Sequence, residues 1–223
     1  MNPLKHTLIC DGPTDVNLIP IINWTLTQVA GVDLVEGIRA EFWRLPCAPD
    51  SLQGRICKAI DLFPCDVLFI HRDAEKESLE MREAEIRAAV ANASASGSKL
   101  PAVAIVPIRM TEAWLLFNES AIRKAAGNPN GQIALNLPPL NKLESRPDPK
   151  KDLQRVLKNA SELQGRRLKK FNLKQAFWRI SDYLDDFTPL RQLSAYSAFE
   201  NAVRRMKANN WNDGFYGLSD NQP

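Results

Sequence analysis

The chain has 223 residues, a net charge of +3 and 44% hydrophobic residues, which suits one large globular domain or one domain with an added lobe. No apolar run approaches the roughly 18 residues of a membrane span, and no signal-peptide core precedes Asp11, so we expect a cytoplasmic protein without membrane contact. The four cysteines form no CxxC pair and there are only two histidines, which argues against structural zinc and favours reduced, buried thiols.

The first 127 residues are predicted to alternate between apolar strands and helices. The expected strands are 6–12, 40–46, 65–75 and 101–110, and the expected helices are 13–31, 50–63, 76–94 and 111–127. Because the strands are apolar on both faces, they predict a parallel sheet covered by helices on both sides. We therefore expect an α/β fold with a Rossmann-like, mostly parallel sheet of about four strands.

The second part of the chain differs from the first in composition and in the pattern of its apolar residues. Residues 128–151 are rich in Pro and Asn and predict a long loop, and residues 152–223 predict a basic helical lobe packed on the first domain. Within that lobe, helices are expected over 152–165, 171–187 and 189–210, with the basic run "RRLKK" at 166–170. Residues 141–223 carry 16 Lys+Arg against 10 Asp+Glu, a net of +6, which leaves −3 for residues 1–140. This asymmetry favours an ion-binding front and a polyanion-binding back.

Acidic side chains follow three of the predicted strands. Asp11 follows the first, Asp73 and Glu75 follow the third, Glu112 follows the fourth, and Asp15 lies one helical turn beyond Asp11. The carboxyl ends of parallel strands meet at one edge of a sheet, where open α/β sheets bind ligands. Clustered carboxylates repel unless a cation neutralises them, and Mg²⁺ prefers such oxygen ligands. The pattern therefore predicts a Mg²⁺ (or Mn²⁺) site.

Structural roles for the same residues remain open. Asp15 or Glu112 could serve only as a helix N-cap, and Glu75 could simply favour the first turn of a helix. His71 is either a hydrogen-bond donor to the acids or a buried histidine without a chemical role. The chain has no GxxxxGK[ST] loop, no GxGxxG after the first strand and no GxSxG elbow, so the usual phosphate loops and a serine hydrolase lack support.

Three segments, "CDGPTDVNLIP", "DVLFIHRDAE" and "VPIRMTEAWLL", resemble the TOPRIM fold, and more narrowly a bacterial TOPRIM-like family of unknown function related to the overcoming-lysogenisation-defect nucleases. TOPRIM domains carry an acid–glycine turn and a DxD motif that bind Mg²⁺ for phosphodiester chemistry. Asp11-Gly12 and Asp73-Ala74-Glu75 match these motifs, Asp15 matches a second acid, and Glu112 lies in an "EAWLL" signature. Here Asp11 replaces the usual Glu and Glu75 replaces Asp, changes that either compensate around a metal or mark a member that binds without cutting.

The resemblance implies roles for these residues. Asp73 and Glu75 would be the main Mg²⁺ ligands, helped by Asp15; Asp11 and Asp73 would be catalytic, with Asp11 a ligand or a general acid/base. Glu112 would hold a second ion or orient another ligand. The expected nucleic-acid-binding residues are Arg72, Arg109, Arg166, Arg167, Lys169 and Lys170. The basic run could equally be a solvated connection between helices, and Phe171, Phe177 and Trp178 beside it are either base-stacking or core residues.

The sequence thus supports a Mg²⁺-dependent nuclease or related phosphodiester phosphoryl-transfer enzyme, acting in prokaryotic phage defence or mobile elements, with nucleic acid and a protein such as an ATPase subunit as expected partners. The alternative is a non-catalytic TOPRIM-like nucleic-acid-binding or regulatory subunit. A hydrolase of small phosphorylated metabolites is a third hypothesis, to which the basic C-terminal lobe lends no particular support.

Overall fold

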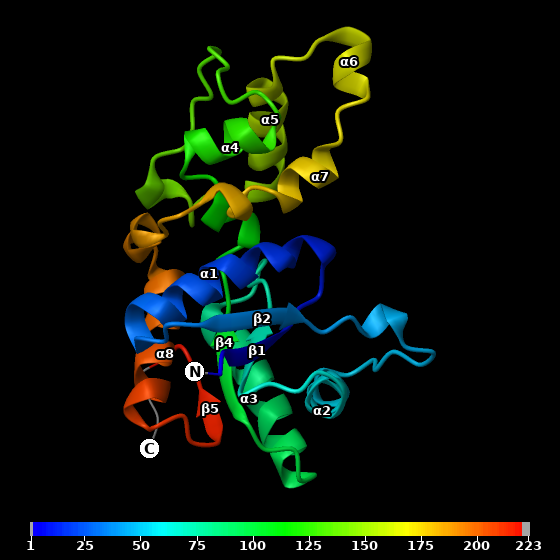
Figure 1. Ribbon diagram of the computed structural model, residues 1–223, viewed down its shortest axis with the longest axis vertical. Helices are drawn as coiled ribbons and strands as arrows, with labels where there is room; N and C mark the ends of the chain where they lie inside the picture. The colour runs from blue at the N-terminus through cyan, green and yellow to red at the C-terminus, as the bar shows by residue number, and fades with distance from the viewer. Residues whose placement is uncertain (1, 220–223) are drawn as a thin grey trace.

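A five-stranded parallel sheet forms the centre of one half of the molecule (Figure 1), a computed structural model that describes residues 2–219. The strands are β1 (Leu4–Ile9), β2 (Val35–Arg39), β3 (Val67–His71), β4 (Pro101–Ile105) and β5 (Gly214–Tyr216), in the order β2-β1-β3-β4-β5. All neighbouring strands pair in parallel. The predicted α/β class and mostly parallel sheet are therefore confirmed.

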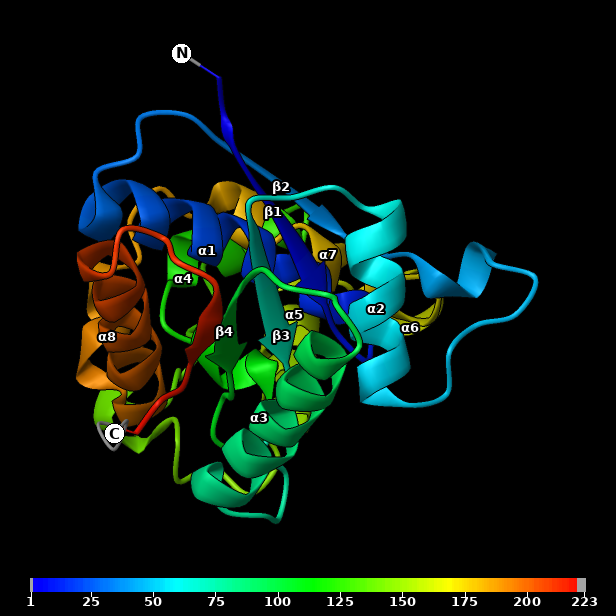
Figure 2. The ribbon, with the colours of Figure 1, turned by 90° about the horizontal axis from the view of Figure 1, so that it is seen from below.

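Helices cover both faces of this sheet. Helix α1 (Leu18–Thr25), which continues as a π-helical turn over Leu26–Ala30, packs beside α8 (Ser194–Ala208) on one face; α2 (Leu52–Leu62) and α3 (Leu79–Ala95) pack together on the other (Figure 2). Ser51 and Ser78 cap α2 and α3 by accepting backbone N–H bonds of 3.0 and 3.2 Å. Because both faces are covered, the central strands β3 and β4 are buried along their whole length.

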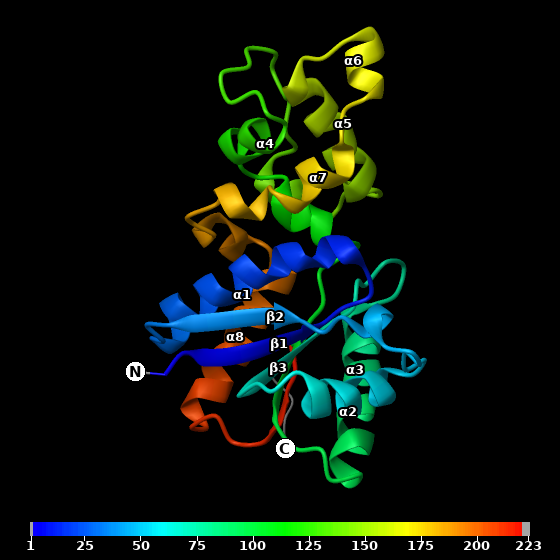
Figure 3. The ribbon, with the colours of Figure 1, turned by 45° about the vertical axis from the view of Figure 1, so that its right-hand side comes forward.

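Between β4 and α8 the chain builds a second, helical lobe (Figure 3). It contains α4 (Glu119–Ala125), α5 (Pro149–Ser161), α6 (Gly165–Lys169) and α7 (Leu173–Trp178), with short 3-10 turns at Thr111–Leu115, Leu140–Lys142, Ser181–Tyr183 and Thr188–Gln192. The chain then returns to the sheet in α8 and β5. Aromatic rings of Trp114, Tyr196 and Phe199 pack edge to face or tilted at this return, with centroids 5.5–6.4 Å apart.

The strand expected at 40–46 is wrong, because that segment contains a 3-10 turn at Phe42–Arg44 and the strand lies earlier, in β2. Strand β2 is a half-exposed edge strand rather than an apolar run. Its Gly37 pairs with His6 of β1, and a Cβ at Gly37 would lie 2.3 Å from His6 Nε2, so only glycine allows the two strands to approach. Strand β5 was not among the strands predicted from the sequence.

Smaller differences concern the loop, the basic run and the thiols. Helix α5 begins at Pro149, inside the expected loop 128–151, because Asp148 caps it by accepting the Lys151 N–H at 2.9 Å. Most of the run 166–170 is helical, in α6. The cysteines are free, but Cys47 is exposed and the others are only partly buried, so the expectation of buried thiols is wrong. No helix within residues 2–219 is long and apolar enough to cross a membrane.

Candidate functional site

The carboxyl ends of β1, β3 and β4 meet at one edge of the sheet, below the helical lobe. Strand β2 lies on one side of β1, and the next strand in sequence, β3, lies on the other side. The strand order therefore reverses beside β1, and open sheets form ligand crevices at such a switch point. A pocket of about 290 Å³ lies there, and we call it the acidic pocket. It is lined by Asp11, Gly12, Thr14, Asp15, Arg72, Asp73, Glu75, Arg82, Met110, Glu112 and Lys150.

Asp73 joins the ends of β3 and β4. Its Oδ1 accepts hydrogen bonds from the Thr111 backbone N–H at 2.9 Å and from the Thr111 hydroxyl at 3.2 Å. Burial raises the pKa of Asp73; the nearby Asp15 carboxylate raises it further, while His71 and Thr111 oppose the shift. Asp73 therefore has a structural role in joining the two strand ends, and its surroundings compensate a negative charge there only in part.

His71, the last residue of β3, lies between two of the acids. Its Nδ1 donates to the Ile105 carbonyl at 3.2 Å, because a carbonyl oxygen can only accept. Its Nε2 consequently faces the pocket, 3.4 Å from Asp73 Oδ1, 3.7 Å from Asp15 Oδ2 and 3.2 Å from the Thr111 hydroxyl. The buried imidazole thus lies within 3.7 Å of both carboxylates without itself lining the pocket.

Asp15 and Glu112 complete the inner wall. Asp15 is buried, and its Oδ2 accepts the Gly12 N–H at 2.7 Å, which fixes the turn after β1. Glu112 is only 5% exposed and forms no ion pair with any described residue. Burial raises the pKa of Glu112 and the Asp73 and Asp15 charges raise it further, while a backbone hydrogen bond and the charge of Lys150 oppose the shift. We call Asp15, Asp73 and Glu112 the inner acids.

Asp11 lies at the outer corner of the pocket and is arranged differently. Its side chain is 46% exposed, and its two oxygens bind Arg55 at 2.8 Å and Arg72 at 2.7 Å. Arg72 also pairs with Glu85 of α3 at 3.1 Å. The Asp11 charge is therefore neutralised by two guanidinium groups, which is the arrangement of a structural ion pair rather than of an available metal ligand.

Glu75 and Arg109 lie on the loops that follow β3 and β4. Glu75 N donates to Arg109 O at 2.9 Å, and Arg109 Nη1 donates to Glu75 O at 3.1 Å. Both residues have positive φ, 53° and 68°, in the left-handed region that side chains rarely adopt. The Glu75 carboxylate is 61% exposed and lies 3.7 Å from Arg82, so it reaches only the rim of the pocket.

The basic residues at the pocket differ from those expected. Arg72 lines it as predicted, and it is joined by Arg82 from α3 and Lys150 from α5, which the sequence did not single out. Arg109 lies outside the lining. The predicted basic run is exposed on α6, at the far tip of the helical lobe (Figure 1), so the structure does not bring it to the acids; its members are Arg166, Arg167, Lys169 and Lys170. Beside it, Phe177 is buried, whereas Phe171 is partly buried and Trp178 is exposed.

The inner acids fit the chemistry of a hard divalent cation, although they are not a finished ligand set. Within residues 2–219, no three His, Cys, Asp or Glu side chains are grouped as ligands for a metal ion. Mg²⁺, however, commonly takes only one or two carboxylates and completes its shell with water and substrate phosphate. Asp73, which is partly exposed, and the buried Glu112, whose ionisation the Asp73 charge opposes, meet that requirement.

Comparison with known proteins adds no family assignment. The chain matches no protein-family model, and no curated protein or solved structure shows significant similarity to it.

Proposed function

We propose that the protein is a Mg²⁺-dependent phosphodiesterase acting on nucleic acid, with the acidic pocket as its active site. The observation that carries this proposal is the combination of partly uncompensated carboxylates with cationic side chains in one pocket at the switch point of the sheet. Phosphoryl transfer needs both, because a metal ion and fixed cations together stabilise the charge that develops on the phosphate oxygens. The resemblance of the strand-end motifs to TOPRIM nucleases agrees with this function.

The residue roles follow from charge balance. Asp73 and Glu112 would hold the Mg²⁺ ion, with Asp15 beside them, and the bound ion would supply Lewis-acid stabilisation of the phosphate. Arg72, Arg82 and Lys150 line the same pocket and would bind the phosphate group. Asp11 and Glu75, which the resemblance makes principal residues, take lesser roles in this proposal because their charges are paired with arginines at the rim.

The test is a cleavage assay with single-stranded DNA, duplex DNA and RNA in Mg²⁺ or Mn²⁺. We expect wild-type cleavage that EDTA abolishes and that Asp73→Asn reduces about a thousandfold, since a metal ion contributes several kcal/mol to such a reaction. Asp61→Asn, the same change at an exposed position on α2, serves as the matched control and should retain full activity. Metal-dependent cleavage that survives Asp73→Asn would contradict the assignment of this pocket.

The second candidate is a non-catalytic nucleic-acid-binding or regulatory subunit, possessing the same scaffold. The pairing of Asp11 with Arg55 and Arg72 favours it, because a neutralised first acid suits a site that binds without cutting. It predicts oligonucleotide binding that is equal in Mg²⁺ and in EDTA, together with no turnover in the assay above. An ATPase partner and a role in phage defence belong to either candidate and remain proposals.

A further inference from the structure

A second hollow, of about 460 Å³, shares a wall with the acidic pocket. Asp11 and Gly12 line both, and the rest of its wall includes Ala40, Phe42 and Trp43 from the segment after β2. Apart from Asp11 and Arg55 the lining is mostly apolar, and Phe42 and Trp43 contribute aromatic rings to it. We call it the Trp43 hollow.

Trp43 remains 58% exposed although a cation lies over its ring, whereas Trp178, which also has a cation over its ring, is 38% exposed. The Arg39 guanidinium lies 4.2 Å from the centre of the indole ring, and Arg39 also donates to the carbonyl of Pro13 at 3.0 Å. The cation therefore ties one face of the ring to the turn after β1, next to Asp11. The indole is oriented at the edge of the hollow without being buried by the protein.

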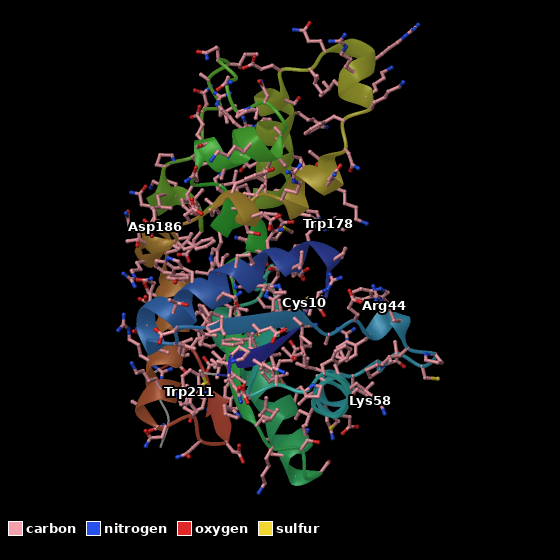
Figure 4. All side chains as sticks on the ribbon, in the orientation of Figure 1. Cys10, Arg44, Lys58, Trp178, Asp186 and Trp211 are labelled. Carbon is pink, nitrogen blue, oxygen red and sulfur yellow. The ribbon has the colours of Figure 1, made fainter. Side chains whose placement is uncertain are left out.

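A third hollow, of about 300 Å³, adjoins the acidic pocket on the side of the helical lobe. Thr14 and Lys150 line both, and Lys174 and Phe177 of α7 complete its wall. Lys174 Nζ lies 4.7 Å from the centre of the ring of Trp178. Trp178 is labelled in Figure 4. The three hollows thus adjoin through shared residues. The Trp43 hollow, with apolar and aromatic walls, lies at one end, the acidic pocket lies in the middle, and the hollow lined by Lys150 and Lys174 lies at the other end.

We propose that this row of hollows binds an extended single strand of nucleic acid, with one base stacked on Trp43 and the backbone held by Lys150 and Lys174. This inference rests on the proposed function, since it names the substrate of the same pocket. Sequence-tolerant binding of single strands combines a cationic groove with aromatic platforms, which are the features at the two ends of this row. In a duplex the bases are stacked and paired, so a base could enter the Trp43 hollow only after it is flipped out.

The test measures the Kd of labelled oligonucleotides in EDTA, so that no cleavage occurs, for a single strand and for a blunt duplex of the same sequence. Trp43→Ala is expected to raise the single-strand Kd about tenfold, the size of one lost base–aromatic stack, and to leave the duplex Kd unchanged. Trp43→Phe keeps a ring and should stay within about threefold of wild type. Leu62→Ala, which removes another exposed apolar side chain outside the three hollows, is the control.

Salt dependence separates the two ends of the row. Because Trp43 is uncharged, Trp43→Ala should leave the slope of log Kd against log salt unchanged, whereas Lys150→Gln/Lys174→Gln should reduce it by about 1.4, at roughly 0.7 per phosphate of a single strand.

DNA and RNA strands of one sequence distinguish the two sources of single strand, and Trp43-dependent binding of either supports the proposal. Unchanged single-strand affinity in Trp43→Ala, or equal losses for strand and duplex, would overturn it. Absence of cleavage with Trp43-dependent binding intact would instead refute only the enzymatic part of the proposed function.

Discussion

The inner acids and the Asp11 corner adjoin at the same edge of the sheet, yet their charges are balanced in different ways. Asp11 is half-exposed and bound by two arginines at 2.7–2.8 Å. Glu112 is buried and Asp73 is partly exposed; burial raises the pKa of both, and the Asp73 charge raises the pKa of Glu112 further. A carboxylate already paired with two guanidinium groups gains little from a metal ion, whereas a buried, poorly compensated one gains much. The comparison therefore favours placing the proposed cation site inside the pocket rather than at its corner.

The largest expected effect contrasts one acid from each region. Glu112→Gln should lower metal-dependent cleavage about a thousandfold, because a ligand of the proposed ion is lost. Asp11→Asn should lower it less than about tenfold, since partly exposed ion pairs contribute roughly 0–1 kcal/mol. Single-turnover cleavage rates in Mg²⁺ and Mn²⁺ measure both. Equal losses in the two variants would remove the distinction between the regions, and a larger loss in Asp11→Asn would reverse it.

The strand ends could be predicted from the sequence because they depend on local patterns. Apolar runs stop at Asp11, at Asp73 and before Glu112, and in a parallel sheet such ends must share one edge. The exposed strand β2 could not be found in this way, because its apolar residues Val35 and Ile38 are three apart and lack the alternation typical of a strand, while the following "EFWRLP" looks more strand-like. Strand β5 spans only Gly214–Tyr216 and pairs with a strand more than a hundred residues earlier, so no local signal marks it.

The partners of the acids were beyond prediction for a related reason. Arg55, Arg82 and Lys150 come from helices α2, α3 and α5, and only the packing of those helices brings them to the strand ends. Conversely, the most basic stretch of sequence folds as α6 at the far tip of the lobe. The basic residues that are adjacent in the sequence are therefore not the ones that gather at the acidic pocket. The role of Asp11 likewise depended on which arginines the fold would bring to it.

A moderate effect is expected from the support of Asp73. Thr111→Val removes the hydroxyl that bonds Asp73 and His71 but keeps the backbone N–H bond, so cleavage should fall about tenfold to a hundredfold with weaker apparent Mg²⁺ affinity. Thr111→Ser restores the hydroxyl and should recover most of the activity. The Mg²⁺ concentration dependence of cleavage is the measurement that separates this role from simple destabilisation. If excess Mg²⁺ gives no recovery in Thr111→Val, the hydroxyl does not position a ligand.

A smaller effect is expected on stability, and its direction depends on pH. The folded-state pKa of Glu112 is raised by burial, so its favourable contribution is complete below the unfolded pKa of about 4.3 and is lost as pH rises through the folded value. In EDTA, Glu112→Gln should therefore be close to wild type at pH 4 and more stable by about 1 kcal/mol at pH 7. Urea unfolding across this range measures the difference. Saturating Mg²⁺ should reduce or reverse this stability difference, because the ion binds only the folded wild type. If the variant is instead less stable than wild type at pH 7 in EDTA, the Glu112 charge is well compensated in the fold.

The smallest expected effect concerns the basic tip. Replacing Arg166, Arg167, Lys169 and Lys170 together by Gln removes four positive charges from α6, which lies far from the acidic pocket. At about 0.15 M salt the Debye length is about 8 Å, so these charges act weakly on a strand bound at the sheet edge and should change its Kd less than about threefold. Lys150→Gln/Lys174→Gln removes only half as many charges and should nevertheless weaken binding more, because these two line the proposed path. A larger loss in the α6 variant would place the nucleic acid on the helical lobe and separate it from the acids.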